Sequence, residues 1–425
     1  MSIMKIEGGV PLRGNVKISG NKNAILPIIA ATLLTDKEVI LDNVPNIKDV
    51  REMLEIMRNL GARVEHEGQR VLIEAKDLKT HEISREECSQ VRTSILFVAG
   101  RLHRFGKAKN YPPGGDVIGR RRLDTHFYGL EKLGSTIKLH TSYDFELKSG
   151  YKGADMFFDE ASVTATEHIM MAAAVSEGTS IIRNAASEPH VQDLAELLNK
   201  MGAKITGIGT NQLTIEGVTS LGGCQHEVVS DHIEAVSFLA IAAATGGEIT
   251  VEGTKMPHYW MARRVFEKLG IQLEFNHDNI FLPADQSRIV KQDIGGGIPR
   301  IDNGPWPQFP SDMMSTMLIL ATQVQGTTLF FEKMFESRMY FVDRLIAMGA
   351  NAIVCDPHRV VISGKSNLRP TTLHSPDIRA GMALLGAALC ANGHSEVHNV
   401  QMIDRGYQDI ENKLLQLGAR VKRFN

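Results

Sequence analysis

Apolar and polar positions along this chain follow a unit that returns six times. In each copy an apolar helical run ends at a Leu-Gly or Met-Gly pair, and a short stretch of alternating apolar and polar residues follows. The glycines of these pairs recur at intervals of roughly 70 residues, at Gly61, Gly134, Gly202, Gly270, Gly349 and Gly418. A regular interval of this length indicates one supersecondary unit used repeatedly.

The third copy shows the unit most clearly. Its predicted elements are a helix, a strand, a second helix and a hairpin, at residues 164–176, 179–183, 191–201 and 203–216. Glycines supply the hairpin turn, and the alternation on both sides of it is typical of paired strands. A unit of this size buries its apolar face only by stacking against its neighbours, so the copies are expected to share a core.

The sixth copy is incomplete. After Gly418 only residues 419–425 remain, which is enough for one strand without a return, and residues 4–12 at the N-terminus form a spare piece. Pairing the two ends completes the copy. Three copies per domain then predict one domain at 22–230 and a second that combines 1–21 with 231–425. The alternative is a run of unrelated α/β units.

The first helix of each copy is expected to open with capping residues. Thr164 with Glu167, and Asp231 with Glu234, have the spacing of capping boxes. Pro376 is expected at the first position of its helix.

Three copies instead carry a cation in the first turn of that helix. These cations are Lys22, Arg92 and Arg379. Each opposes the helix dipole. Either they are solvated surface cations, or they converge on a bound anion held at the helix N-termini.

A basic loop replaces the strand expected after the first helix of the second copy. It runs from Pro112 to Arg122, with a Gly-Gly pair at 114–115 and three arginines at 120–122. Proline and glycine are typical of a mobile lid, and arginines bind phosphate by charge-assisted hydrogen bonds. A solvated basic turn is the alternative.

Composition narrows the classes of function. The chain has 47 basic and 49 acidic residues, so it lacks the basic excess of a general nucleic-acid binder. Four cysteines without a Cys-x-x-Cys pair, and 15 histidines without ligand spacing, predict neither a disulfide framework nor a metal site. No apolar run approaches the roughly 18 residues of a membrane helix, and no signal pattern opens the chain. We therefore expect a cytoplasmic protein with no membrane or nucleic-acid partner.

Over essentially its whole length the chain resembles the enolpyruvyl transferases. The segments that carry the resemblance are Ser19–Ala24, Gln90–Ile95, Pro113–Arg121, Asn184–Pro189, Phe309–Met313, Asp377–Ala380 and Ile403–Tyr407. The resemblance implies a two-domain inside-out α/β barrel, with six βαβαββ repeats, three per domain, and the active-site cleft between the domains. This agrees with the repeat that the pattern itself predicts.

The resemblance also implies a reaction. Enolpyruvyl would pass from phosphoenolpyruvate to the 3-hydroxyl of UDP-N-acetylglucosamine, with release of phosphate, as the first committed step of peptidoglycan synthesis; no cofactor is implied. One alternative is a related transferase that uses another nucleotide acceptor. A more distant alternative is a nucleotide-binding or scaffold protein without catalysis.

Site residues follow from the same matched motifs. The implied catalytic residues are Asp116 as acid, Asp312 as base, Lys22 and Arg405. The implied phosphoenolpyruvate-binding residues are Lys22, Arg92, Arg121, Arg379 and Arg405. The implied UDP-sugar-binding residues are Asn23, Arg92, Arg121, Asp124, Ser162, Val163, Thr164, Glu188, Asp312 and Met334.

The chain departs from the family pattern at five positions. Asp116 stands where the loop usually has cysteine. The other four positions lie near the family's nucleotide contacts, and they are Arg122, Glu160, Thr164 and His232, in place of Pro, Lys, Gly and Arg. These four bear on the identity of the acceptor rather than on the chemistry.

Overall fold

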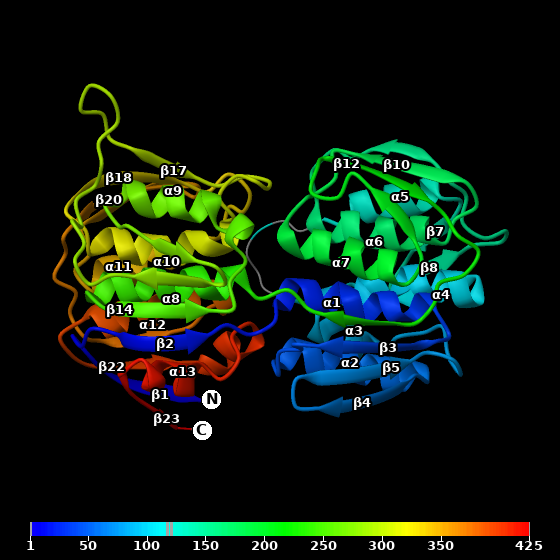
Figure 1. Cartoon of the computed structure of the whole chain (residues 1–425), viewed down its shortest axis with the longest axis horizontal. Helices are drawn as coiled ribbons and strands as arrows, with labels where there is room; N and C mark the ends of the chain where they lie inside the picture. Colours follow the sequence, from blue (N-terminus) through cyan, green and yellow to red (C-terminus); the bar gives the residue numbers. More distant parts are fainter. Residues whose placement is uncertain (1, 116–118, 120–121, 425) are drawn as a thin grey trace. The chain divides into compact units, whose positions relative to one another are not determined.

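A computed structural model describes residues 2–115, 119 and 122–424 of the chain (Figure 1). These residues form two compact units. The terminal unit contains the segment that ends at Ser19 and the segment that begins at Ser230. The inserted unit contains Gly20–Gly115 and the residues from 122 to Val229. The expected boundaries lie one or two residues from these.

The described part of the terminal unit contains three sheets of four strands each. The first is, in spatial order, β21 (Thr372–His374), β22 (Gly393–His398), β1 (Ile3–Gly8) and β23 (Arg420–Phe424). The second is β15 (Glu274–Asn276), β16 (Asn279–Leu282), β14 (Glu248–Glu252) and β2 (Arg13–Lys17). The third is β17 (Arg300–Asp302), β18 (Gly326–Phe331), β20 (Arg359–Gly364) and β19 (Ala352–Asp356). Each sheet pairs one edge strand in parallel and the others antiparallel.

The inserted unit repeats this plan in its described residues. One sheet is β13 (Cys224–Glu227), β3 (Glu38–Asp42), β5 (Arg70–Glu74) and β4 (Arg63–Glu67). A second is β11 (Lys204–Thr206), β12 (Gln212–Glu216), β10 (Thr179–Arg183) and β9 (Asp155–Phe157). The third is β6 (Lys107–Asn110), β8 (Tyr143–Glu146) and β7 (Thr136–Leu139). A parallel bridge from Glu82 to Lys109 stands where the other sheets have a parallel edge strand.

Largely apolar helices that are buried over most of their surface lie inside each unit. In the terminal unit they are α8 (His232–Thr245), α10 (Ser311–Thr322) and α12 (Ile378–Cys390), which pack against one another (Figure 1). In the inserted unit they are α1 (Lys22–Ala31), α4 (Phe97–Phe105) and α6 (Val163–Ala174). A helix with no polar face is stable only when it is surrounded. The sheets therefore lie outside and the helices inside, which is the inside-out arrangement.

The second helix of each copy is amphipathic. In α2 (Lys48–Leu60) the buried residues include Val50, Met53, Leu54 and Met57, at the spacing of one helical face. The corresponding helices are α5 (Asp124–Lys132), α7 (Pro189–Lys200), α9 (Trp260–Lys268), α11 (Val342–Ala347) and α13 (Ile410–Gln416). The remaining helices are α3 (Arg85–Gln90) and the short 3₁₀ helices η1 (Thr32–Leu34), η2 (Arg92–Leu96), η3 (Met256–His258) and η4 (Val400–Arg405).

The marker glycines end these second helices. All six have positive φ, from 73° at Gly270 to 106° at Gly61 and Gly202. Glycine adopts this left-handed conformation without the penalty of a side chain, and it commonly ends a helix. The need for a residue with positive φ at the end of each second helix explains why glycine recurs at these six positions.

The chain ends meet as the sequence predicts. β1 lies between β22 and β23 and is antiparallel to both, with Ile3 opposite Phe424. The N-terminal strand thus completes the sixth copy. The two segments that cross between the units also pair: Asn21 N–H donates to Val229 O at 2.7 Å, and Asp231 N–H donates to Ser19 O at 2.9 Å.

Three local predictions are wrong. The second copy does have a strand after its first helix, β6, because the chain turns at Gly106 before the Pro112 loop. Pro376 precedes the helix cap, since Asp377 caps α12. Ser162, and not Thr164, caps α6.

Candidate active site

Lys22 opens α1 of the inserted unit. Asn21 caps this helix, because its side chain accepts hydrogen bonds from the backbone of Asn23 and Ala24. Lys22 Nζ lies 2.9 Å from Asp49 Oδ2, and both side chains are almost completely buried. The cation that opposes the dipole is therefore balanced by a carboxylate of α2 within the protein. Asn23, the second residue of α1, is half-buried.

Arg92 opens η2 and is half-buried. Its Nη2 donates to the backbone oxygen of Arg122 at 3.4 Å. Its positive charge also acts on His126, where burial lowers the pKa of the imidazole well below its usual value and His168 and Arg92 lower it further. Arg92, the end of the Pro112 loop and α5 are thus near one another.

A buried histidine pair connects α5 with α6. His126 Nδ1 and His168 Nδ1 are 3.0 Å apart, so one of them donates to the other. His126 Nε2 lies 3.1 Å from the Thr164 hydroxyl. Burial lowers the pKa of His168 to about 3, so both rings are neutral near pH 7. Thr164 acts as a partner of His126 in place of the capping role that its spacing predicts.

Two carboxyl groups at α6 and α7 influence each other electrostatically. Glu188 caps α7 and is half-buried, whereas Glu167 of α6 is fully buried. Burial raises the pKa of Glu167 well above its usual value, and the charge of Glu188 raises it further. The protonated form of Glu167 is therefore favoured more than in an exposed carboxyl group. The capping role expected for Glu167 is wrong, because the Ser162 side chain alone caps α6.

Asp312 lies in the first turn of α10 in the terminal unit. Its Oδ1 accepts from Arg338 Nη2 at 2.8 Å, and its Oδ2 accepts from Arg379 Nε at 3.2 Å. Both arginine side chains are almost fully buried, and the Asp312 side chain is 27% exposed. The two guanidinium groups orient the carboxylate and stabilise its charged form.

Arg379 connects Asp312 with the start of α12. Burial lowers its pKa, but Tyr407, Asp312 and Asp231 together raise it more, so the guanidinium stays charged. Its Cζ lies 5.2 Å from the centroid of the Tyr407 ring. Its Nη1 is buried and has no hydrogen-bond partner among the described residues. A buried, charged donor without a partner is costly, and an anionic ligand would satisfy it.

The remaining predicted residues lie in both units. Asp124 is exposed at the start of α5, and Ser162 and Val163 are half-buried at the start of α6. Arg405 is half-buried at the end of η4, and Met334 is 38% exposed. Asp116 and Arg121 lie outside the described residues. The structure thus brings together Arg92 with His126 and Thr164, and Asp312 with Arg379.

Several residues of these clusters are not apparent from the sequence pattern. Asp49 and Arg338 are the ion-pair partners of Lys22 and Asp312, and His168 completes the histidine pair. Nothing in a linear pattern connects Lys22 with a residue on another helix. For His168 the available signal was a histidine inside a largely apolar helical run.

No group of three or more His, Cys, Asp or Glu side chains that could hold a metal occurs within the described residues. In that same part of the chain, every helix is too short or too polar to cross a membrane.

Comparison with known families places this fold. The family model of EPSP synthase (3-phosphoshikimate 1-carboxyvinyltransferase) matches residues 6–414. Among solved structures, the enolpyruvyl transferase NikO from Streptomyces tendae has a TM-score of 0.89 at 21% identity, covering 99% of this chain and 98% of that one. An EPSP synthase from Acinetobacter baumannii has a TM-score of 0.76 at 17% identity, and each chain is covered completely. The predicted two-domain inside-out α/β fold is confirmed.

Curated relatives are much more similar in sequence. A protein of Borreliella burgdorferi named UDP-N-acetylglucosamine 1-carboxyvinyltransferase is 50% identical over 418 residues, 98% of each chain. A protein of the same name from Treponema pallidum is 48% identical over 422 residues, 99% of each chain. The chain therefore belongs to the enolpyruvyl transferase family, and within it to the group of the UDP-N-acetylglucosamine 1-carboxyvinyltransferases.

Proposed function

We propose that the protein transfers enolpyruvyl from phosphoenolpyruvate to the 3-hydroxyl of UDP-N-acetylglucosamine, releasing phosphate for peptidoglycan synthesis. The names and full-length identity of the curated relatives support this substrate pair. The structural observation that carries the proposal is Arg379, whose buried guanidinium pairs with Asp312 and keeps one donor unused. That donor suits a carboxylate or a phosphate. Both substrates are charged molecules of the cytoplasm, where the reaction is expected.

The reaction is an addition followed by an elimination. The acceptor oxygen bonds to C2 of phosphoenolpyruvate, its proton passes to a base, and C3 receives a proton from an acid. The C2–O bond to phosphate then breaks, C3 loses a proton, and the enol ether forms. We assign Asp312 as the base and Asp116 as the acid.

Cations hold the donor in this proposal. Lys22, Arg92, Arg121, Arg379 and Arg405 bind the phosphate and carboxylate of phosphoenolpyruvate. Asp312 is the present partner of Arg379. When a substrate anion takes over that guanidinium, the Asp312 carboxylate loses a stabilising charge and becomes a stronger base. Binding of the donor thus activates the base.

Residues of both units hold the acceptor. The proposed contacts are Asn23, Arg92, Arg121, Asp124, Ser162, Val163, Thr164, Glu188, Asp312 and Met334. The hydroxyl of Thr164 is engaged by His126 Nε2 at 3.1 Å, which fixes its orientation at the start of α6. A glycine, usual at this position in the family, would have no such contact.

Phosphate release from phosphoenolpyruvate tests the proposal. We expect release with UDP-N-acetylglucosamine, much less with UMP or UDP-glucose, and none without an acceptor. Asp312→Asn should lower turnover by about 10²-fold or more, the usual contribution of a base. Asp356→Asn is the matched control, since Asp356 pairs with Arg359 at the surface.

Two results would contradict the assignment. Faster release with UMP than with UDP-N-acetylglucosamine would favour the alternative of another nucleotide acceptor. Near-native turnover of Asp312→Asn would remove Asp312 as the base.

A further inference from the structure

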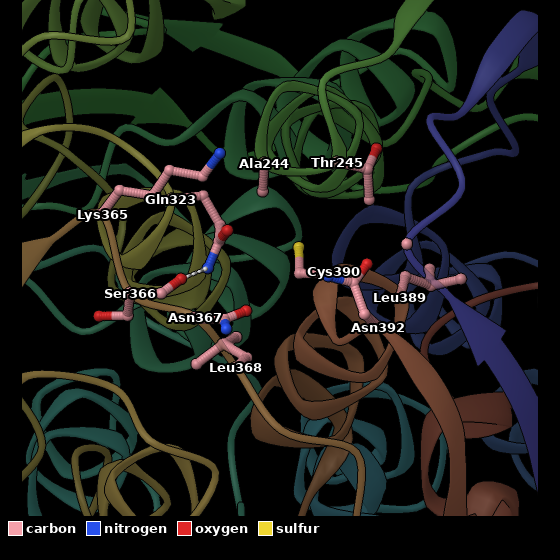
Figure 2. Close-up of a pocket in the computed structure, with 11 residues that line it drawn as sticks. Ala244, Thr245, Gln323, Lys365, Ser366, Asn367, Leu368, Leu389, Cys390 and Asn392 are labelled. Carbon is pink, nitrogen blue, oxygen red and sulfur yellow. Dashed lines mark hydrogen bonds between the residues drawn. The ribbon is translucent and has the colours of Figure 1, made fainter.

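A cavity of about 450 Å³ lies at the C-terminal ends of the three inner helices of the terminal unit. Thr245 ends α8, Gln323 follows α10 and Cys390 ends α12, and all three line the cavity. Figure 2 shows Lys365, Gln323, Ser366 and Asn367 on one side and Cys390, Leu389 and Asn392 on the other. The volume is in the range of small-molecule sites.

This cavity is distinct from the candidate active site. Asp312 and Arg379 lie at the N-terminal ends of α10 and α12, and the cavity lies at the opposite ends. Ser311–Thr322 has 12 residues, which at the rise of an α-helix separates the two ends by about 18 Å. No step of the proposed reaction uses a residue that lines it.

A second cavity of about 460 Å³ shares two lining residues with the first, Gln323 and Lys365. It adds Arg288, whose Nη2 donates to Ala284 O at 3.2 Å and whose Nε is buried without a hydrogen-bond partner among the described residues. Lys365 therefore lies where the two cavities adjoin.

The charges around this space do not cancel. Lys365 has no carboxylate within 4.0 Å in the described part of the chain, and no acidic residue is among the described residues that line either cavity. The Cys390 thiol supplies no counter-charge, because burial raises its pKa to about 12 although Lys365 lowers it. Two cations thus face the space without an anion.

The helix ends are a competing influence, because helix C-termini favour cations. One carbonyl near the end of each helix, however, already has a donor from a backbone N–H outside the helix. Gly9 N–H donates to Leu389 O, Gly247 N–H to Ala242 O and Ser366 N–H to Thr322 O, each at 2.8 Å. Satisfied carbonyls attract a cation less strongly than the free ones of an open helix end. Lys365 and Arg288 therefore make the net charge around the cavities positive.

We propose that this cavity binds a small organic anion, whose carboxylate or phosphate pairs with Lys365 Nζ. The amides of Asn367 and Asn392 are available to polar atoms of its body, and Ala244, Leu368 and Leu389 contribute apolar contacts on different sides of the cavity. A charged contact, a few amides and apolar side chains are the groups by which small-molecule sites hold a ligand. The proposal does not depend on the proposed function.

Methyl NMR tests the site directly. The full-length protein, labelled at alanine and leucine methyls, is titrated with phenyl phosphate, benzoate and benzylamine. We expect saturable shifts of the Ala244, Leu368 and Leu389 methyls with one or both anions, and none with benzylamine. The anion that binds more tightly identifies the head group. These methyls report on the cavity, so binding of phenyl phosphate at the candidate active site is not confused with it.

Lys365→Met provides the matched variant, and Lys422→Met, at an exposed position of β23, provides the control. Lys365→Met should weaken anion binding about tenfold, the loss of one charge-assisted pair, while melting temperature and phosphate release stay unchanged. Lys422→Met should bind like the wild type. The proposal is overturned if neither anion shifts these methyls, if benzylamine binds as tightly as the anions, or if Lys365→Met binds like Lys422→Met.

Discussion

At the scale of residues, the charges of the candidate site are paired within the protein. Lys22 is paired with Asp49, and Asp312 with Arg338 and Arg379. A substrate anion can reach the unused Nη1 of Arg379 directly, but it must replace a carboxylate to use the donors that are already paired. Because of this exchange, the stability of each residue's charged form depends on the ligand that is bound. A carboxylate can change in this way from a structural partner into a base.

The Lys22–Asp49 pair should contribute strongly to stability. Asp49→Asn leaves the buried Lys22 ammonium without its carboxylate, and breaking a buried pair costs about 3 kcal/mol in the free energy of unfolding. Urea unfolding measures this change. The control is Lys204→Met, which breaks an exposed pair with Glu216 and should cost less than about 1 kcal/mol. Equal losses in the two variants would contradict the buried role of Asp49.

The buried histidines should make stability depend on pH. Because burial lowers the pKa of His168 to about 3, the unfolded chain takes up protons below pH 6.5 that the folded chain does not. Stability therefore falls as pH falls from 6.5 towards 3, and His168 alone contributes a loss of about 2 kcal/mol between pH 7 and pH 5.

His168→Asn keeps a polar atom near the Nδ1 position and cannot be protonated in this range. The free energy of unfolding of this variant should fall by about 2 kcal/mol less than that of the wild type between pH 7 and pH 5. His140→Asn, at a position exposed to water, is the control. An unchanged pH dependence in His168→Asn would mean that the ring is protonated in the folded protein.

Sequence alone located one member of the Lys22–Asp49 pair and two members of the Asp312 cluster. Lys22, Asp312 and Arg379 stand in the first turn of a predicted helix, and helix starts are visible in the pattern of caps and apolar runs. Their partners are not, because Asp49 and Arg338 come from other elements that only the fold brings near. The prediction for Thr164 failed for a related reason. Its spacing to Glu167 fits a capping box, but in the structure Ser162 caps α6 and the Thr164 hydroxyl is a partner of His126.

At the scale of elements, repeated units were easier to predict than single strands. The hairpins and the second helices have clear periods and a glycine with positive φ at the junction. The parallel first strands were missed by the pattern, because β9, β17 and β21 have three residues each and too few positions to show alternation. The family resemblance supplied them as the first strand of βαβαββ.

Close contact between inner helices should make one glycine of α4 sensitive. A Cβ at Gly100 would lie 2.5 Å from Leu33 Cβ, an atom that cannot move without its backbone. Gly100→Ala gains about 1 kcal/mol of helix propensity but loses about 1–3 kcal/mol by overpacking, so we expect net destabilisation in urea.

Gly386→Ala in α12 is the comparison for this prediction. There the nearest atom is Ile241 Cγ1 at 2.8 Å, on a side chain that can rotate. The loss should therefore be smaller than in Gly100→Ala. A stabilised Gly100→Ala variant would show that η1 and α4 can separate at little cost.

At the scale of the whole molecule, the chain is closed by its own ends. β1 and β23 are antiparallel neighbours, with Ile3 opposite Phe424. A circular permutant that joins the ends through a short glycine linker and opens at Gly68, in the β4–β5 turn with nothing near its Cβ position, should fold. Its melting temperature should stay within about 5 °C of the wild type, because new ends in an exposed turn break no core contact.

Calorimetry and phosphate release check this permutant together. Opening the same joined chain at Gly100, inside α4, is the control and should abolish the folded state. If the Gly68 permutant failed while the linear chain folded, the junction of β1 with β23 would not tolerate a covalent link.

The placement of β1 also has a consequence for biosynthesis. On the ribosome, the inserted unit has all its strands once Glu227 has emerged, whereas β1 must wait until β22 and β23 have also been made. At usual elongation rates this delay is about 20–80 s. During that time β1, whose Met4 and Ile6 are buried in the folded protein, stays without its neighbouring strands while the nascent chain is still attached to the ribosome. The terminal unit is therefore the part of the molecule that is most prone to aggregate and to bind chaperones before the chain is released from the ribosome.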